Sequence, residues 1–395
     1  MRAVHLRKER GAVLVLGLLL LLVATLIGIS ALNTSTYDIL ISGNEKASVQ
    51  AFYAAEAGIN EFMGRFRAGA TNQISDGDPL NPAWKILLAK DPGKGGTQIG
   101  YASGGSNSIP SLQSQLDFGV EIKHKVDENN QVIKYGGVPV YLLKSYGFTA
   151  DGGNRVLEVE LIKSPNYDPP SALYSETPID IHGGLTYING NDACGAMDKP
   201  GIITTTATTP SISESGNPSI NGSPAQVTQA SVPPPANLPL GEMLSYLRSD
   251  ANFKYGYNEN QTLNGVSDGW GTPASSDTAV PITYTGPMNI IYFNMQGTQT
   301  LTLTGDSHGA GILLVEGNLK INGGFTWYGV ILVTGAVEYS GGGRRNVTGG
   351  IMAGENAPMG ISIDEKAGIL YCSSISDRLK DIVPPLKMTR WREVF

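Results

Sequence analysis

A run of apolar, uncharged residues near the N-terminus constrains this chain more than any other feature. It reads AVLVLGLLLLLVATLIGISAL and extends from Ala12 to Leu32. A helix of about 21 residues is ~30 Å long at ~1.5 Å per residue, which matches the hydrocarbon thickness of a bilayer. Helix is also the open structure that satisfies its own backbone hydrogen bonds in lipid. The run therefore predicts one transmembrane helix over residues 12–32.

The leader before this run sets its orientation. Residues 1–11 hold four basic residues and one acid: Arg2, Arg7, Lys8, Arg10 and Glu9. Because positive charge stays on the cytoplasmic side, we expect the N-terminus inside and the rest of the chain outside. A secretory signal has a shorter apolar core and then a small-residue cleavage site, for which Ser30-Ala31 is the nearest candidate. A plain signal anchor accounts equally well for the charge and the length.

The helical pattern continues beyond the apolar run. Residues 33–67 contain no proline, and small or apolar side chains recur at three- and four-residue spacing: Ile39, Leu40, Gly43, Ala47, Ala51, Ala54, Ala55 and Gly58. One helix over residues 12–67 would be ~80 Å long. Its first half is apolar all round and its second half is amphipathic. A free anchor does not need such a second half, whereas a subunit that packs helix against helix does.

Two motifs in this region resemble a known family. Gly11 stands directly before the apolar run, and AFYAAEAGINEF follows at Ala51–Phe62. Together they resemble a type IV prepilin of the PilX-type minor pilin group. The resemblance implies that prepilin peptidase cuts after Gly11 and that Ala12 becomes the methylated N-terminus. It also implies partners: other minor pilins, the major pilin, the inner-membrane assembly platform and a tip adhesin.

One position departs from the family pattern. Major pilins usually carry a glutamate at the fifth mature position, where this chain has Leu16. In the family that carboxylate is thought to pair with the N-terminal amine of a neighbour, and a buried charge without a partner is costly. A subunit that lacks it resembles one with no neighbour beyond it, at or near the filament tip.

Length and composition describe the remainder. The chain has 395 residues, enough for about two domains outside the membrane. A net charge of −7 makes nucleic acid an unexpected partner. Fifty glycines with only 16% charged residues are typical of an all-β exported protein. The four histidines have no metal-ligand spacing, so no cofactor is expected, although Asp76, Asp78 and Asn81 supply oxygen ligands suited to calcium or simply form a solvated turn.

Residues 68–165 predict a small pilin-like α+β domain with an antiparallel sheet. Asn129-Asn130 indicates a hairpin turn between strands at 120–126 and 131–135. Asp151-Gly152-Gly153 indicates a second turn, between strands at 138–149 and 155–163. Such a sheet needs one covered face, which the second half of the N-terminal helix can provide.

Residues 166–375 predict a Gly-rich parallel β-solenoid-like domain. GILLVEG at Gly311–Gly317 recurs as GVILVTG at Gly329–Gly335, an offset of about 18 residues. Short β runs that end in glycine at this period favour stacked coils, although two similar hairpins are the alternative. We expect an earlier strand over 179–187 and an insertion at about 200–270 that includes an amphipathic helix from Leu240. Residues 376–395 are expected to form a cap or tail.

The two cysteines, Cys194 and Cys372, can pair in an oxidising periplasm or remain separate thiols, since their spacing does not decide between these. If residues 182–194 belong to an early coil, the two cysteines come close together.

An enzyme is the remaining class, because β-solenoids also house polysaccharide lyases and hydrolases. Such sites need a carboxylate pair, or a carboxylate with basic residues, on one face. The candidates are Asp306, His308, Glu316, Glu338, Arg344 and Arg345. Glu316 and Glu338 lie off the 18-residue period, and GxSxG, HExxH and P-loop motifs do not occur. We predict no catalytic residues.

The expected fold class is therefore α+β, mostly β. The expected protein is an inner-membrane minor pilin with a periplasmic C-terminal part that later reaches the pilus surface. Its predicted role is to prime pilus assembly or to support adhesion from the tip. A signal-anchored envelope adhesin unrelated to pili is the alternative.

Overall fold

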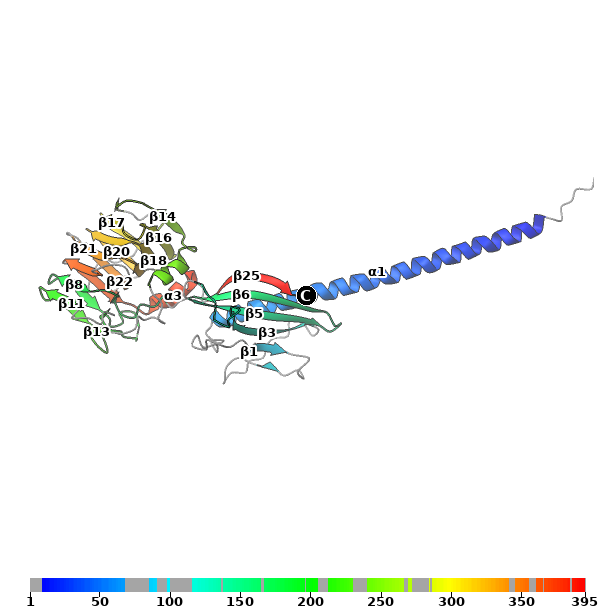
Figure 1. Ribbon diagram of the computed structural model, residues 1–395, viewed down its shortest axis with the longest axis horizontal. Coiled ribbons are helices and arrows are strands. Elements are labelled where there is room, and N and C mark those ends of the chain that lie inside the picture. Colours follow the sequence, from blue (N-terminus) through cyan, green and yellow to red (C-terminus); the bar gives the residue numbers. More distant parts are fainter. Residues whose placement is uncertain are drawn as a thin grey trace, which may run out of the picture. The chain divides into compact units, whose positions relative to one another are not determined.

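The computed structural model describes residues 9–67, 85–90, 98–99, 116–135, 138–164, 167–195, 197–204, 212–229, 240–265, 269–271, 284, 286–340, 345–354, 360–364, 366–383 and 386–394. The chain divides into two compact units. The first comprises Met1–Lys123, Leu142–Glu160 and Arg390–Phe395, and the second comprises His124–Tyr141 and Leu161–Thr389. The units interleave in sequence, so the single boundary expected near residue 165 does not separate them. Figure 1 shows the elements of both.

One helix, α1 (Glu9–Arg67), accounts for the N-terminal part of the chain. It runs for 59 residues without a break, which confirms the predicted continuous helix. Its three described threonine hydroxyls before residue 37 each donate to a backbone carbonyl one turn back, for example Thr25 Oγ1 to the oxygen of Leu22 at 2.8 Å. The hydroxyls are therefore satisfied within the helix, as an apolar surrounding requires.

A seven-stranded antiparallel sheet follows in the order β2-β1-β3-β5-β6-β25, with β4 paired to β5. Its strands are β1 (Lys85–Lys90), β2 (Gln98–Ile99), β3 (Leu116–His124), β4 (Lys134–Tyr135), β5 (Val138–Thr149), β6 (Asn154–Lys163) and β25 (Leu386–Val394). The predicted turn at Asp151–Gly153 is confirmed, with Gly152 at φ +86° and its N–H bonded to the oxygen of Thr149 at 3.1 Å.

The predicted turn at Asn129-Asn130 is also present. Asn130 has φ +59°, and the carboxylate of Asp127 accepts the N–H groups of Asn129 and Gln131 at 2.8 Å. Its two arms meet at a single antiparallel bridge between Val126 and Val132. The second arm then continues into β4, which pairs with β5, so this hairpin is shorter than predicted.

The remaining strands form two parallel sheets. The larger has the order β12-β9-β24-β22-β20-β18-β16-β14, with β7, β10 and β13 attached, and the smaller has the order β11-β8-β23-β21-β19-β17-β15. Strands of the larger sheet are β7 (Leu173–Ser175), β9 (Tyr187–Asn189), β10 (Ile202–Thr204), β12 (Ser219–Asn221), β13 (Val227–Gln229), β14 (Phe253–Gly256), β16 (Asn289–Asn294), β18 (Ser307–Glu316), β20 (Phe325–Val333), β22 (Arg345–Ala353) and β24 (Ala367–Tyr371). Those of the smaller are β8 (Ile179–His182), β11 (Ile212–Ser215), β15 (Gln261–Asn264), β17 (Thr300–Thr304), β19 (Asn318–Asn322), β21 (Val337–Ser340) and β23 (Ile361–Asp364).

From β14 to β24 the chain passes alternately through these two sheets, and the repeat seen in the sequence sets the register there. Gly311 of β18 pairs with Gly329 of β20, and Leu319 of β19 pairs with Val337 of β21, both at the predicted offset of 18 residues. The next step is longer, since Gly329 pairs with Gly349. The repeat therefore marks successive parallel strands and not two hairpins.

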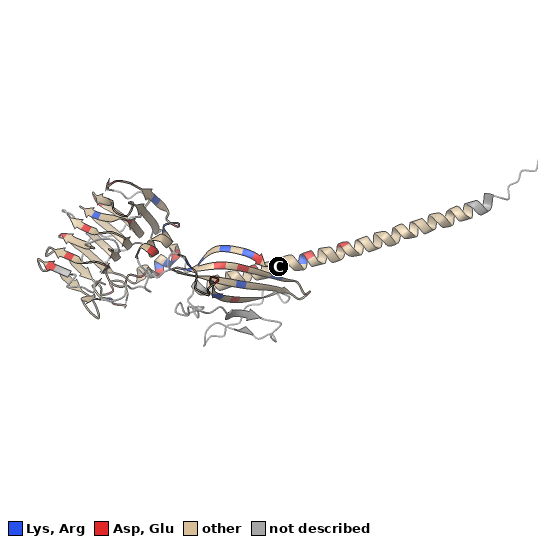
Figure 2. Cartoon of the chain, viewed as in Figure 1, with Lys and Arg blue, Asp and Glu red and all other residues tan. Residues whose placement is uncertain are grey.

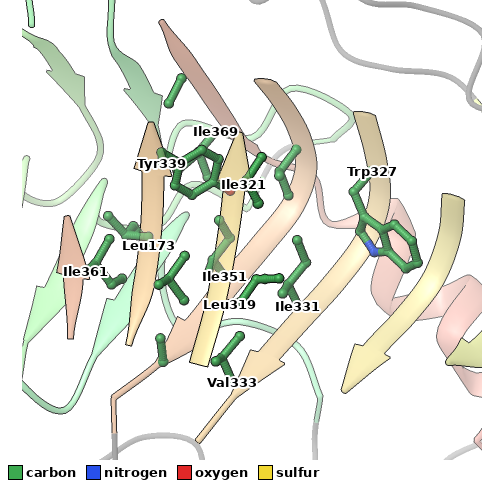
Figure 3. Packing of buried hydrophobic residues seen from close by; sticks show 14 of the residues in the cluster. Leu173, Leu319, Ile321, Trp327, Ile331, Val333, Tyr339, Ile351, Ile361 and Ile369 are labelled. Atoms are coloured by element: carbon green, nitrogen blue, oxygen red, sulfur yellow. The ribbon is translucent and has the colours of Figure 1, made fainter. Parts of the chain in front are cut away.

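Aliphatic ladders between the sheets form the core of the second unit (Figure 3). One row in the larger sheet is set by direct pairing and contains Ile291, Leu313, Ile331, Ile351, Leu173 and Ile202. Each of these side chains is fully buried. Full burial of such a side chain contributes about 1.5–3 kcal/mol, so these rows supply much of the stability of the stack.

The strands of the second unit that come first in the chain and those that come last meet in the middle of the stack. Strand β22 pairs with β7, β23 with β8, and β24 with β9, so the first strands of the unit pack against the last. The chain therefore enters in the middle of the stack, adds β10–β13 in one direction, and then returns from β14 at the opposite end.

Three sequence expectations for this region are corrected. Residues 200–270 are not an insertion, because Ile202, Ile203 and Ile220 are buried and β10–β15 belong to the sheets. The strand expected over 179–187 is two strands, separated at Gly183, which has φ +120°. The C-terminal segment is helix α3 (Ser374–Ile382) followed by β25, which extends the antiparallel sheet beside β6.

The amphipathic helix expected from Leu240 is α2 (Leu240–Leu247), which buries Met243, Leu244 and Leu247.

Candidate membrane and assembly helix

The first half of α1 presents a continuous apolar surface, which no described part of the chain buries. Every described side chain from Val13 to Leu32 is exposed, and Val13 and Leu32 are 71% and 70% exposed. Among the described residues, α1 is the one helix long and apolar enough to cross a membrane. Figure 2 shows this segment free of charged residues, and in the sequence the next charged residue after Arg10 is Asp38. This surface needs an apolar cover that the chain itself does not provide.

The second half of α1 packs closely against the antiparallel sheet of the first unit. Ala51, Ala54 and Ala55 are fully buried. Ser145 of β5 donates a hydrogen bond to the backbone oxygen of Ala55 at 2.7 Å. This bond replaces the hydrogen bond to water that the carbonyl loses when the helix packs against the sheet. A Cβ at Gly147 would clash with the backbone of Ala51. Small residues on both elements therefore let the two backbones approach, which explains the alanine-rich motif at Ala51–Phe62.

The C-terminal strand β25 contacts α1 through side chains and so helps to hold the helix on the sheet. The guanidinium of Arg155 lies between α1 and β25, with Nε donating to Ser48 Oγ at 2.9 Å and Nη1 at 2.9 Å from the Glu393 carboxylate. The rings of Phe52 and Trp391 meet edge to face with centroids 6.3 Å apart. This role of β25 could not be predicted from the sequence, because nothing local in TRWRE identifies its partner.

A buried carboxylate stabilises the opposite face of the same sheet. Glu158 is 7% exposed and accepts a hydrogen bond from Arg392 Nε at 2.9 Å, while Lys144 Nζ lies 3.8 Å away. Nearby, burial and then the charge of Glu121 raise the pKa of Tyr146 to about 12. The face that α1 leaves uncovered is thus polar and ion-paired.

The residues expected to be processed lie at the start of α1. Gly11 and Ala12 are part of the helix, which begins at Glu9. Leu16, which stands where major pilins usually carry glutamate, is 65% exposed. Cleavage and methylation therefore stay predictions for this position.

We call the place where β7–β9 pair with β22–β24 the seam of the second unit, and a disulfide lies there. Cys194, which follows β9, is bonded to Cys372, which follows β24, across a sequence separation of 178 residues. The carboxylate of Asp192 brackets this seam, because Oδ1 accepts the N–H groups of Cys194 and Ser373, both at 3.0 Å. Burial raises the pKa of Asp192, but hydrogen bonds from Ser373, Cys194 and Met197 outweigh it and leave that pKa lowered.

A second ion pair lies beside the disulfide. Lys199 Nζ contacts the carboxylate of Asp168, and it also stands 4.6 Å from the ring centroid of Tyr371. The hydroxyl of Tyr371 donates to Asp168 Oδ1 at 3.0 Å. Burial, followed by the charge of Asp168, raises the pKa of Tyr371 well above its usual range. These contacts join segments beside the first strands of the second unit to β24, its last parallel strand in chain order.

Among the residues considered for catalysis, those whose side chains the structure describes do not come together in one site. Glu316 ends β18 of the larger sheet and accepts a hydrogen bond from Tyr292, whereas Glu338 lies in β21 of the smaller sheet and pairs with Lys320 at 2.5 Å. The ring of His308 lies 3.0 Å, through Nδ1, from the backbone oxygen of Asp306. The side chains of Arg344 and Arg345, and the calcium candidates Asp76, Asp78 and Asn81, lie outside the described residues. The described part of the chain contains no group of three or more His, Cys, Asp and Glu side chains that could hold a metal ion.

These features define a class of protein with a single long N-terminal apolar helix and a largely β remainder that contains antiparallel and parallel sheets. The comparisons with known proteins then specify the N-terminal part. Residues 10–60 match the family model PilX N-terminal, which confirms the resemblance found in the sequence for that segment.

Two further comparisons add little. The comparison with curated proteins gives no match. Among solved structures, the crystal structure of the competence-associated pilin ComZ from Thermus thermophilus is similar at 14% identity, over 88% of this chain and 97% of that one, with a TM-score of 0.23. That TM-score is too low to carry a conclusion, so the interpretation depends on the N-terminal match and on the helix itself.

Proposed function

We propose that this chain is a minor pilin of the type IV pilus, of the PilX type. The observation that carries the proposal is the division of α1 into two halves with different surroundings. Residues 13–32 are apolar and exposed, while Ala51, Ala54 and Ala55 are buried against the chain's own sheet. The first half is suited to exchange a lipid cover for a cover of neighbouring helices, and the second half holds the rest of the protein at a fixed place on the helix.

In this proposal the precursor sits in the inner membrane with a single pass and a periplasmic C-terminal part. Prepilin peptidase removes residues 1–11, and the assembly platform then extracts the subunit into a pilus with the major pilin and other minor pilins. Leu16 supports a position at or near the tip, since a leucine there cannot form an ion pair with the amine of a neighbour. The subunit would prime assembly, or support adhesion together with a tip adhesin.

The second unit has a presenting role in this proposal. We interpret its alternating parallel strands as a β-solenoid, because each coil stacks on the next through aligned aliphatic rows. A disulfide and an ion pair stabilise the seam, and a disulfide persists in the oxidising environment outside the cell. Both features therefore suit a domain that is exposed there.

Pilus preparations from cells with and without this chain test the proposal. We expect the chain to co-purify with sheared pili and its deletion to lower piliation or adhesion. A Gly11→Leu variant, which blocks the expected cut while keeping the apolar helix, should accumulate in the membrane and be missing from pili. Recovery of uncut chain in normal pili would contradict the proposal.

A further inference from the structure

Three polar side chains meet on the outer face of the smaller parallel sheet, in a part of the chain that the pilin role does not use. In β8 the inward residues Ile179 and Ile181 are buried, which turns Asp180 and His182 outward on the same face. Strand β11 runs parallel to β8 with Ser215 directly paired to His182. The sheet register therefore brings Ser215 to a histidine that lies 33 residues earlier in the sequence and to the aspartate two residues before that histidine.

These side chains form one hydrogen-bonded chain. Ser215 Oγ lies 2.6 Å from His182 Nδ1, and Asp180 Oδ2 lies 2.8 Å from His182 Nε2. An ionised carboxylate can only accept, so the proton on the ring is at Nε2 and Nδ1 is the acceptor. The hydroxyl of Ser215 then donates to Nδ1. This is the order of nucleophile, base and orienting acid that activates a serine.

The carboxylate is placed to stabilise a charged imidazole. Its second oxygen, Asp180 Oδ1, is buried and has no hydrogen-bond partner among the described residues. His182 is therefore the described residue that stabilises the negative charge of this carboxylate, and their attraction increases when the ring takes up a proton.

The backbone around Ser215 turns tightly and is rich in glycine. Gly183 N donates to the oxygen of Ser215 at 2.9 Å, which holds the end of β11 against the end of β8. Gly216 and Asn217 follow with φ +82° and +60°, so the chain turns sharply directly after the serine. In serine hydrolases the N–H after the nucleophile commonly helps to bind the oxyanion, and here that N–H belongs to Gly216. Ser215 is exposed, and the side chain of His182 is 47% exposed, so a small ligand can reach both.

We propose that Ser215 is an activated nucleophile that accepts the acyl group of small carboxylic esters. Its Oγ bonds to the carbonyl carbon while its proton passes to His182 Nδ1. The ester C–O bond breaks, and the departing alkoxide takes that proton and leaves as an alcohol. Water then attacks the acyl-serine by the same route and releases the carboxylic acid. Because the site is open to solvent, we expect slow turnover, and the role of the chain as a pilin does not depend on it.

A fluorophosphonate probe tests this on the full-length chain in detergent. Attack by Ser215 forms an Oγ–P bond and releases fluoride, so intact mass and peptide mapping should find one adduct, located at Ser215. Asp180→Asn and His182→Ala should each slow labelling by at least ~100-fold, the usual contribution of a positioned general base. The matched control is Ser219→Ala, an exposed serine whose hydroxyl accepts from the amide of Asn221 at 3.2 Å, and it should label like the wild type.

The result does not depend on how the variants fold. No adduct on the wild-type chain, or an adduct at another residue, overturns the proposal. Asp180→Asn keeps the size of the side chain, but its amide no longer requires the proton of His182 to be on Nε2. Labelling of Ser215 at an unchanged rate in this variant would therefore also overturn the proposal. A slow hydrolysis of p-nitrophenyl acetate that disappears in Ser215→Ala is the expected second readout.

Discussion

Cys194 and Cys372 are bonded to each other where β24 pairs with β9, so the disulfide joins strands that come early and late in the chain but are neighbours in the parallel stack. Among the described residues, the earlier strands of the second unit (β7–β13) pair with its later strands (β14–β24) only where β7–β9 meet β22–β24. The covalent link therefore lies at the seam on which the integrity of the unit depends.

Replacement of both cysteines, Cys194→Ser with Cys372→Ser, should destabilise the second unit. A loop of 178 residues is closed by the bond, and loss of its constraint on the unfolded chain corresponds to as much as about 5 kcal/mol. Thermal unfolding followed by circular dichroism measures the effect. Reductant should lower the melting temperature of the wild type and leave that of the double variant unchanged; equal melting temperatures for the two proteins would contradict this role.

Gly329→Ala should be among the more damaging single substitutions in the stack. Gly311, Gly329 and Gly349 are aligned across β18, β20 and β22, and all three have positive φ, at +116°, +138° and +140°. A Cβ on Gly329 would clash with the backbone oxygen of Gly311. We expect a loss of about 1–3 kcal/mol in the free energy of unfolding. Gly256→Ala, where nothing lies within 4 Å, is the control and should change stability little.

Gly147→Ala should loosen α1 from the antiparallel sheet. The added methyl group would meet the carbonyl of Ala51, so the helix must shift or the strand must bend, at a cost of about 1–3 kcal/mol. Limited proteolysis near residues 60–67 would detect the loosened helix. Gly64→Ala serves as the control, because Gly64 has no neighbour within 4 Å and alanine favours helix. If both variants resist proteolysis equally, the close packing is not important for holding the helix.

The carboxylate of Asp192 should make the seam sensitive to acid. Its pKa in the folded protein is lowered from the ordinary 3.8, so folding favours the ionised form. The stabilisation is fully present above that ordinary value and is lost as the pH falls through it towards the folded pKa. The melting temperature of Asp192→Asn should thus be lower than that of the wild type at pH 7, and the difference between the two melting temperatures should become smaller below pH 3.8. A difference that stays constant with pH would exclude this role.

Much of the fold follows from patterns that act locally. The continuous α1 was predictable because an apolar run and a proline-free amphipathic segment adjoin, and the 18-residue register was predictable because GILLVEG and GVILVTG repeat. The strands at 202–229 were not, because runs of three or four residues in a Ser/Thr/Pro-rich tract carry too few alternations to be distinguished from a loop. Their place is set by the aliphatic rows of neighbouring coils.

The long-range relationships were the least predictable. Nothing in TRWRE identifies β6 and α1 as its neighbours, since strand pairing over more than 200 residues has no local signature. For the same reason, the Ser215–His182–Asp180 chain could not be found by motif. Asp180 and His182 carry a local signal, an alternating pair on one strand, but Ser215 is brought to them by the register of β11 against β8.

The mass of the mature N-terminus tests the central claim most directly. The chain would be isolated from the cells that produce it, and its N-terminal peptide would be analysed by mass spectrometry. A pilin processed as proposed begins at Ala12 and carries a methyl group on that amine. A chain that retains residues 1–11, in cells whose pili form normally without it, would contradict the account.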